Sequence, residues 1–263
     1  MPTLTAAGRT LAYEWIAANA GASARDAAAA PVLVFLHEGL GSIAQWRDFP
    51  ARLARATGCN ALVYDRYGYG QSDVLVEPRR SVRFMHEEAL EALPEVLAAR
   101  GIASPLLVGH SDGASIALIH AGAGHAVRGV AVLAPHVFVE DGGLRSIEDT
   151  AAQFETGGLR EGLARYHRDP VRTFRMWADV WLDPAFRRWN IEEYLPGIRC
   201  PVMGIQGEDD VYGTSAHLGA IEKQVSGPCE QVWLARCGHS PFRDQPEATL
   251  AALTRFVRGV IGP

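Results

Sequence analysis

The sequence is poor in cysteine, and it has no uninterrupted hydrophobic run of membrane-spanning length. Its four cysteines form no Cys-X-X-Cys pair, which argues against a zinc knuckle or a dithiol redox site, so we expect buried, reduced thiols at Cys59, Cys200, Cys229 and Cys237. No segment approaches the roughly 18 apolar residues of a transmembrane helix. The N-terminus also lacks a basic segment followed by an apolar run, so the sequence predicts a soluble, cytoplasmic protein with no membrane partner.

Basic clusters and cofactor motifs are also missing. The formal net charge is -5 and Lys and Arg form no block, which argues against a nucleic-acid partner. The glycines between Asp65 and Gly70 do not follow the Gly-X-X-X-X-Gly-Lys-Ser/Thr pattern of a phosphate-binding loop, and no strand-like run opens into Gly-X-Gly-X-X-Gly. The histidines show no metal-ligand spacing. We therefore expect no cofactor and no metal ion.

The pattern that is present alternates apolar runs with helix-forming segments. At 263 residues and 48% hydrophobic, the chain can form one domain with an inserted subdomain. Unbroken apolar runs that alternate with helices are typical of a parallel sheet covered on both faces, so the predicted fold class is α/β. Strands are expected at Leu11 to Ile16, Val32 to Leu36, Ala61 to Tyr64, Leu106 to Val108 and Val130 to Leu133, and helices at Ile43 to Thr57, Ser81 to Arg100 and Ala114 to Ala123. The Ala-rich stretch from Ala22 to Ala30 is expected to be a surface loop.

The alternation stops after residue 134 and resumes near residue 199. The intervening segment is rich in charges, aromatics and helix-compatible runs, and it contains no convincing strand. Strand-like runs return at Pro201 to Ile205 and Gln231 to Leu234, and a helix is expected from Pro246 to Val260. The sequence thus predicts a core of residues 1–134 and 199–263 and a helical cap of residues 135–198. This cap would lie over the carboxyl edge of the sheet, where open parallel sheets bind ligands.

One octapeptide carries the clearest chemical signal. In Leu107-Val108-Gly109-His110-Ser111-Asp112-Gly113-Ala114, a strand-like run meets a Gly-X-Ser-X-Gly pentad where a helix begins. Such a nucleophile elbow holds its central residue in a strained turn, and the flanking glycines are needed because larger side chains would collide. We therefore expect Ser111 to lie exposed at the carboxyl edge of the sheet.

A serine hydroxyl is a weak nucleophile unless a base takes its proton and an acceptor orients that base. Suitable residues follow the next two strand-like runs, because Gly207-Glu208-Asp209-Asp210 follows one and Cys237-Gly238-His239-Ser240 follows the other. The order serine, aspartate, histidine is the order expected when one parallel sheet carries all three. Ser111 and His239 are therefore candidate catalytic residues, with either Asp209 or Asp210 as the acid.

Five motifs in the same order resemble the α/β-hydrolase superfamily over nearly the whole chain, and within it the serine esterases and thioesterases with a helical cap. The motifs are Leu36-His37-Glu38-Gly39-Leu40-Gly41-Ser42, Asp65-Arg66-Tyr67-Gly68-Tyr69-Gly70-Gln71-Ser72, the elbow, Gly207-Glu208-Asp209-Asp210 and Gly238-His239-Ser240-Pro241. The resemblance implies an α/β-hydrolase fold with a mostly parallel central sheet and an inserted cap, and it selects Asp210 as the triad acid. It also implies an oxyanion hole made by the amide of Asp112 and that of Gly39, with Leu40 as the alternative.

Further residues are candidates for substrate binding. Glu38 departs from the family pattern, and we expect it to brace its loop, with a role in substrate placement or water control as the alternative. His136 stands where the sheet leads into the cap. Trp177 and Trp181 share a helix face with Phe174, a pattern that is usually core; a part that lined the cleft would favour an apolar or aromatic acyl group.

The function hypothesis is a serine hydrolase that cleaves a small or medium carboxylic ester or thioester through an acyl-enzyme. The alternatives are hydrolysis of a C–C bond or lactone during aromatic-compound degradation, and a non-catalytic ligand-binding protein of the same fold. The expected partner is a small-molecule acyl substrate. The sequence leaves the oligomeric state open between monomer and homodimer.

Overall fold

The computed structural model describes residues 1–18 and 30–262, and within them an eight-stranded sheet. The strand order is β1-β2-β4-β3-β5-β6-β7-β8; β2 pairs antiparallel with β1 and β4, and all other pairs are parallel. The strands are β1 (Thr3–Ala6), β2 (Arg9–Ile16), β3 (Val32–Leu36), β4 (Asn60–Tyr64), β5 (Leu106–His110), β6 (Gly129–Leu133), β7 (Val202–Gly207) and β8 (Cys229–Leu234). The α/β class and the mostly parallel sheet are confirmed. Except for Ala30, the predicted Ala-rich loop lies outside the described residues. The prediction of four buried cysteines is wrong for Cys200 and Cys229, which are half-buried, whereas Cys59 and Cys237 are buried.

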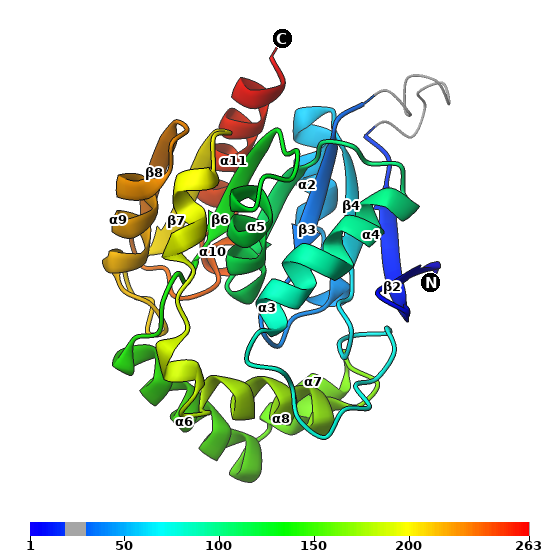
Figure 1. The fold of residues 1–263 in the computed structure, drawn as a ribbon, viewed down its shortest axis with the longest axis vertical. Coiled ribbons are helices and arrows are strands. Elements are labelled where there is room, and N and C mark those ends of the chain that lie inside the picture. Colours follow the sequence, from blue (N-terminus) through cyan, green and yellow to red (C-terminus); the bar gives the residue numbers. More distant parts are fainter. Residues whose placement is uncertain (19–29, 263) are drawn as a thin grey trace.

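Helices cover both faces of the sheet, as Figure 1 shows. Side chains that alternate along β3 enter two separate cores: Leu33 and Phe35 pack with α2 (Phe49–Thr57) and α11 (Pro246–Ile261), and Val34 and Leu36 enter the core on the other face. That second core includes residues of α3 (Phe84–Glu87), α4 (Leu93–Ala99), α5 (Asp112–Gly122) and α9 (Ser215–Gln224). Since β3 is buried on both sides, its run is uniformly apolar rather than alternating.

Two predicted helices differ from the structure by more than one or two residues at an end. The segment predicted as one helix from Ile43 to Thr57 is a 3₁₀ turn, η1 (Ile43–Trp46), followed by α2, because Arg47 between them has a positive φ of 55° that no α-helix allows. The helix predicted from Ser81 begins at Phe84 and contains a π-helical turn, η2 (Glu88–Ala92). This wider turn precedes Pro94, whose ring would clash with a backbone carbonyl one turn earlier in a regular α-helix.

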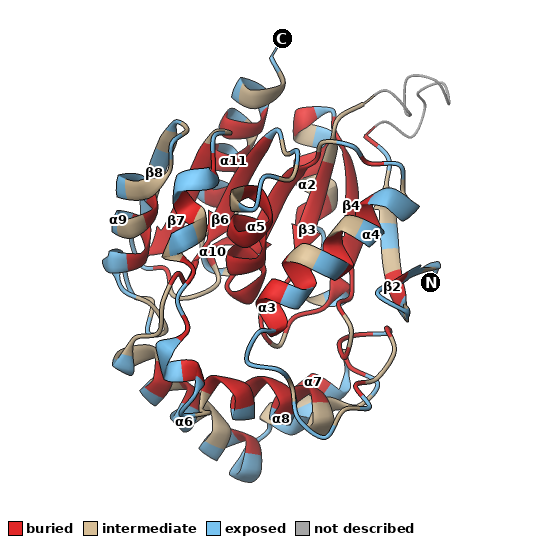
Figure 2. Cartoon of the chain, viewed as in Figure 1, coloured by how far each residue is buried: buried red, intermediate tan, exposed pale blue. Residues whose placement is uncertain are grey.

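The segment between β6 and β7 is a helical insertion at the carboxyl ends of the parallel strands (Figure 1). It contains α6 (Asp141–Thr156), α7 (Leu159–Ala164), α8 (Pro170–Trp181), η3 (Phe186–Arg188) and η4 (Glu192–Gly197). Its single β-pairing among the described residues is an isolated bridge between Phe138 and Asn190. Phe154 of α6 stacks on Phe174 of α8 with ring centroids 3.9 Å apart. Figure 2 shows these helices buried on the side that faces the sheet and exposed on the other.

Membrane-spanning helices are absent from the described part of the chain: none of its helices is long and apolar enough to cross a bilayer.

Candidate active site

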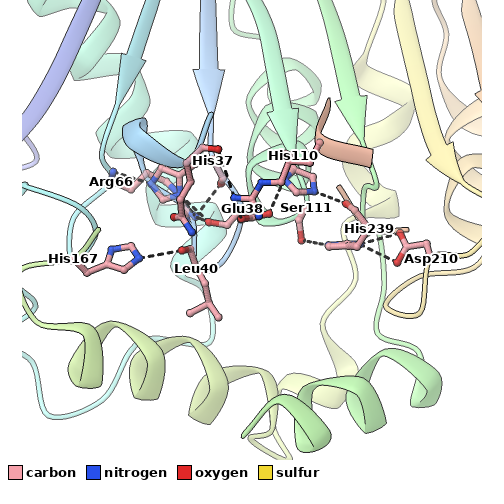
Figure 3. A network of polar contacts seen from close by, with 11 residues as sticks. His37, Glu38, Leu40, Arg66, His110, Ser111, His167, Asp210 and His239 are labelled. Atoms are coloured by element: carbon pink, nitrogen blue, oxygen red, sulfur yellow. Dashed lines mark hydrogen bonds and ion pairs between the residues drawn. The ribbon is translucent and has the colours of Figure 1, made fainter. Parts of the chain in front are cut away.

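Ser111 occupies a strained turn between β5 and α5. Its φ of 53° and ψ of −119° lie in a region that residues with a Cβ rarely adopt. The two flanking glycines are required by space: a Cβ on Gly109 would lie 2.3 Å from the carbonyl oxygen of Gly113, and one on Gly113 would lie 2.0 Å from that of Leu36. The predicted steric reason for both glycines is confirmed, and the turn brings the Ser111 side chain to the edge of the sheet that faces the helices of the insertion (Figure 3). The prediction that Ser111 is exposed is wrong, because it is only 7% exposed.

A continuous hydrogen-bonded chain joins Ser111, which follows β5, to an acid that follows β7, two strands away in the sheet. The Nε2 atom of His239 lies 2.9 Å from Ser111 Oγ, and its Nδ1 atom lies 2.9 Å and 3.0 Å from the two carboxylate oxygens of Asp210 (Figure 3). Asp209, the alternative acid, instead donates its backbone N–H to the carbonyl of Cys237. The structure therefore brings together Ser111, Asp210 and His239.

Opposite pKa shifts stabilise charge on the histidine and on the acid. Burial would lower the pKa of His239, but the hydrogen bond and charge of Asp210, aided by the negative charge of Glu38, raise it above its ordinary value of 6.5. Burial would likewise raise the pKa of Asp210, but the His239 contact lowers it, assisted by hydrogen bonds from the Tyr212 backbone N–H and the Gln206 amide. An imidazolium at His239 is thus favoured next to a carboxylate that stays ionised.

The loop after β3, which the sequence predicts to supply an oxyanion donor, is held by a buried arginine. The Arg66 guanidinium donates to the carbonyl oxygens of His37 and Glu38, at 3.1 Å and 2.8 Å. The Arg66 backbone N–H donates to His37 Nε2, so Nδ1 carries the proton of the neutral ring and lies 2.7 Å from the Glu38 carbonyl. Burial, with the nearby charge of Arg66, lowers the pKa of His37 well below its ordinary value. His37 therefore supports its loop in the neutral form.

The side chain of Glu38 binds the histidine next to the serine. Its carboxylate lies 2.8 Å from His110 Nδ1, and the Nε2 atom of that ring lies 2.6 Å from the backbone carbonyl oxygen of His239. Burial alone would raise the pKa of Glu38, but His110 and the Arg243 guanidinium lower it to about 2. The His110 ring thus bridges the Glu38 carboxylate and the His239 backbone carbonyl. This contact ties the Glu38 side chain to the residue before the nucleophile.

A histidine of the helical insertion also contacts the loop. His167 Nδ1 accepts the backbone N–H of Gly70, so its Nε2–H donates to the carbonyl of Leu40 at 3.0 Å (Figure 3). Sequence reasoning assigned no role to His167 or Arg66. Arg66 had a signal, since it lies in a strand-end motif, but His167 is 127 residues from Leu40 and had none.

A cavity of about 270 Å³ opens in front of Ser111. Three of the predicted substrate residues, His136, Trp177 and Trp181, line it, together with Glu38. Phe174, which shares their helix face, does not line the cavity and is fully buried in the core. The aromatic stripe of α8 is thus divided between core and cavity.

The predicted oxyanion residues Asp112, Gly39 and Leu40 lie together on the wall of this cavity. The backbone N–H groups of Gly39 and Leu40 have no acceptor among the residues that the structure describes, whereas that of Gly41 donates to the Glu38 carbonyl. Free amides next to the serine are what an oxyanion hole needs. In the described part of the chain, no group of three His, Cys, Asp or Glu residues is arranged to hold a metal ion.

A family model described as the alpha/beta hydrolase family matches residues 33–253, which include the elbow, the acid and the histidine. The chain belongs to the α/β hydrolase family. A search of curated protein sequences finds no significant match to this α/β hydrolase.

Solved structures similar to this α/β hydrolase agree on the fold. MGS-M2, an alpha/beta hydrolase enzyme from a Medee basin deep-sea metagenome library, is 20% identical with a TM-score of 0.73, over 100% of this chain and 98% of that one. A thermophilic esterase from Thermogutta terrifontis is 16% identical with a TM-score of 0.74, over 98% of each chain. The enol-lactonase from Burkholderia xenovorans LB400 is 16% identical with a TM-score of 0.73, over 97% of this chain and 99% of that one. At these identities the likeness shows the fold alone.

Proposed function

We propose that the protein is a serine hydrolase that cleaves a small or medium carboxylic ester, or a thioester, through an acyl-enzyme. The observation that carries the proposal is the hydrogen-bonded chain from Asp210 through His239 to Ser111, which ends at a cavity. We further propose residues 1–134 and 199–263 as the catalytic core and residues 135–198 as the cap that closes this cavity.

Acylation begins when His239 Nε2 takes the Ser111 hydroxyl proton as Oγ bonds to the substrate carbonyl carbon. The carbonyl oxygen becomes an oxyanion, which accepts hydrogen bonds from the amide of Asp112 and from that of Gly39 or Leu40. Each such donor contributes about 3 kcal/mol to the transition state. The ester C–O bond then breaks, and the imidazolium returns its proton to the departing alcohol.

Deacylation repeats these steps with water. His239 takes a proton from a water molecule whose oxygen bonds to the acyl carbon, and the second tetrahedral intermediate expels Ser111. The proton passes back to Oγ, and the carboxylic acid leaves. Asp210 stays ionised throughout and holds Nδ1–H, so that Nε2 faces the serine in the form that accepts a proton.

Lactone hydrolysis is a second candidate, because a lactone is a cyclic ester and the same steps open it. Two similar structures are described as an enol-lactonase and as Est816, an N-acyl homoserine lactone degrading enzyme. A panel of open-chain esters, thioesters, lactones and ring-cleavage dienoates, with product analysis, distinguishes these reactions from C–C bond hydrolysis.

The test uses the Ser111→Ala variant and a fluorophosphonate probe. Wild-type protein should hydrolyse p-nitrophenyl esters and form an adduct that peptide mass spectrometry assigns to Ser111. The Ala variant should lose the adduct and more than about 1,000-fold in kcat, with an unchanged circular dichroism spectrum. Full activity in the variant would exclude the mechanism, and a wild-type protein that forms no adduct would instead indicate a non-catalytic binding protein.

A further inference from the structure

Asp112, the residue after the nucleophile, lines the cavity, and one of its carboxyl oxygens has no hydrogen-bond partner. Asp112 is 1% exposed, and its Oδ1 atom accepts a hydrogen bond from Trp181 Nε1 at 3.2 Å. Its Oδ2 atom is buried and has no hydrogen-bond partner, and no cationic nitrogen of the described residues lies within ion-pairing distance. Buried carboxyl oxygens are nearly always hydrogen-bonded, so this one points to a ligand.

A free donor lies beside that oxygen. The indole N–H of Trp177 makes no hydrogen bond to any residue within the described ranges, although Trp177 lines the same cavity. A Cβ built on Gly39 would lie 2.1 Å from Trp177 Nε1 and 3.0 Å from Asp112 Oδ2. Both atoms therefore lie close to the backbone of Gly39, and only a glycine at this position leaves room for the Trp177 indole.

This pair of groups selects the chemistry of what binds there. An indole N–H only donates, and a carboxylate oxygen only accepts. An ammonium group has no acceptor for Trp177, a ketone or ether has no donor for Asp112, and a methylene group leaves both unsatisfied. A hydroxyl group accepts from the one and donates to the other.

We propose that Asp112 and Trp177 form a subsite for a hydroxyl group on the acyl part of the substrate, on one of the first two carbons beyond the scissile carbonyl. The position follows from the chain, because the same residues, Asp112 and Gly39, carry the amides proposed to bind the oxyanion. The inference rests on the proposed function. It identifies the substrates as esters of 2-hydroxy or 3-hydroxy acids.

Two arginine charges act on the acid of this subsite. Burial raises the pKa of Asp112, while the charges of Arg66 and Arg80 oppose this shift and favour the carboxylate that accepts the hydroxyl proton. Leu159, Leu163 and Ile147 supply an apolar surface elsewhere in the cavity for the rest of the acyl chain.

Binding is measured first, without turnover, on the Ser111→Ala variant. Calorimetric titrations compare methyl esters of 2-hydroxy, 3-hydroxy, 3-oxo, 3-amino and unsubstituted acids of equal chain length. One of the hydroxy esters should bind at least about tenfold more tightly than its unsubstituted partner, which is the value of one or two hydrogen bonds to a buried polar pair. Equal binding of the two, undetectable binding of all esters, or a preference for the oxo or amino ester overturns the subsite.

Substitutions then locate the preference. Trp177→Phe and, separately, Asp112→Asn are each introduced into the Ser111→Ala background, and each should reduce the ratio of hydroxy-ester to unsubstituted-ester affinity to within about threefold of one. Ile147→Val is the matched control, since it alters the apolar wall and should leave that ratio unchanged. A ratio that survives both polar substitutions excludes the two residues as its origin.

Hydrolysis by the wild-type protein separates this inference from the proposed function. Cleavage of both esters with equal kcat/KM supports the hydrolase and overturns the subsite. Selective binding of the hydroxy ester without cleavage of any ester supports the subsite and overturns the hydrolase.

Discussion

His110 places a second histidine–carboxylate pair directly behind the proposed catalytic one. Its ring nitrogens contact the Glu38 carboxylate and the backbone carbonyl of His239, so it links the loop after β3 to the loop that carries His239. The negative charge of Glu38 would oppose an oxyanion if it were free, and the contacts with His110 and Arg243 offset it. The pair thereby fixes the position of the loop that contains Glu38 relative to the loop that contains His239.

The stability of the Glu38→Gln variant should depend on pH. Since folding lowers the pKa of Glu38 from its ordinary value of 4.5 to about 2, its contribution is complete above pH 4.5 and is lost as the pH falls toward 2. Near neutral pH, the variant should lose about 3 kcal/mol in the free energy of unfolding. Urea unfolding across this pH range measures the loss. Glu247→Gln, which removes an exposed ion pair with Arg52, is the control and should change stability far less. A loss that does not shrink at acid pH contradicts the assignment.

The pH profile of esterase activity should report His239. Its raised pKa means that the acid limb of kcat/KM has its midpoint above 6.5, because the protonated ring cannot accept the serine proton. Asp210→Asn should lower kcat by about 10⁴ and move that midpoint to lower pH, since the hydrogen bond and charge that raise the pKa are removed. Asp209→Asn, a neutralisation one residue away, should keep the wild-type midpoint. A wild-type midpoint below 6.5, or equal effects of the two substitutions, would count against the assigned roles.

Local signals predicted some of these residues and could not predict others. Ser111, the pair Asp209 and Asp210, and His239 each follow an apolar strand-like run, and parallel strands place such positions at one edge of the sheet. This pattern left the two aspartates as alternatives, and only the resemblance to the family selected Asp210. The partners of Glu38 and Asp112 depend on side-chain directions after the chain has folded, and no spacing rule encodes them.

At the scale of elements, the elbow depends on the close approach of α5 to β3. Gly113→Ala should destabilise the fold by about 3 kcal/mol or more, because the new methyl group would lie 2.0 Å from the Leu36 carbonyl oxygen and the backbone must shift. Gly219→Ala is the matched control: this exposed glycine lies within α9 with no atom near its Cβ position, so the substitution should stabilise by about 1 kcal/mol. Thermal and urea unfolding measure both. A Gly113→Ala variant as stable as the wild type would disprove the steric account.

Periodicity predicted the elements whose environment is uniform and was less accurate where it changes. The apolar runs of β3 to β7 were located because both sheet faces are covered. The strand β1 was missed, since it is an edge strand of four residues with little apolar content, which pairs with β2 in a hairpin. The break between η1 and α2 was missed as well, because it comes from the backbone angle at Arg47 and not from a change in composition.

At the scale of the whole molecule, the insertion and the sheet share one buried core. Leu144 and Phe174 of the insertion belong to the same cluster as Leu36 and Val132 of the sheet. Polar contacts add to it, since Thr173 Oγ1 donates to the Gly68 carbonyl at 2.7 Å. The helices over the cavity are therefore held to the loops that form it, and the geometry of the cavity depends on these contacts.

His167→Ala tests this connection. The substitution removes the acceptor for the Gly70 N–H and the donor for the Leu40 carbonyl, so it should cost about 1–3 kcal/mol. Hydrogen exchange should accelerate in α8 and in the loop that contains Leu40, while β5 stays protected. His125→Ala removes a half-buried histidine that makes no hydrogen bond to any described residue, and it should change neither. Faster exchange throughout β5, or none in α8, would show that His167 does not connect the two parts.

The wild-type protein should approach the behaviour of this variant in acid. Burial lowers the pKa of His167, and only the neutral ring can accept the Gly70 N–H, so the contribution is complete above the ordinary histidine pKa and is lost as the pH falls through the lowered value. Exchange in α8 of the wild type should therefore rise toward that of His167→Ala at acid pH, after correction for the intrinsic pH dependence of exchange.

The His167→Ala variant should also change the kinetic constants. Since Leu40 lies in the loop proposed to supply an oxyanion donor, loss of the hydrogen bonds of His167 should raise KM and lower kcat together. A variant that raises only KM would mean that His167 affects substrate entry alone and leaves the oxyanion loop in place.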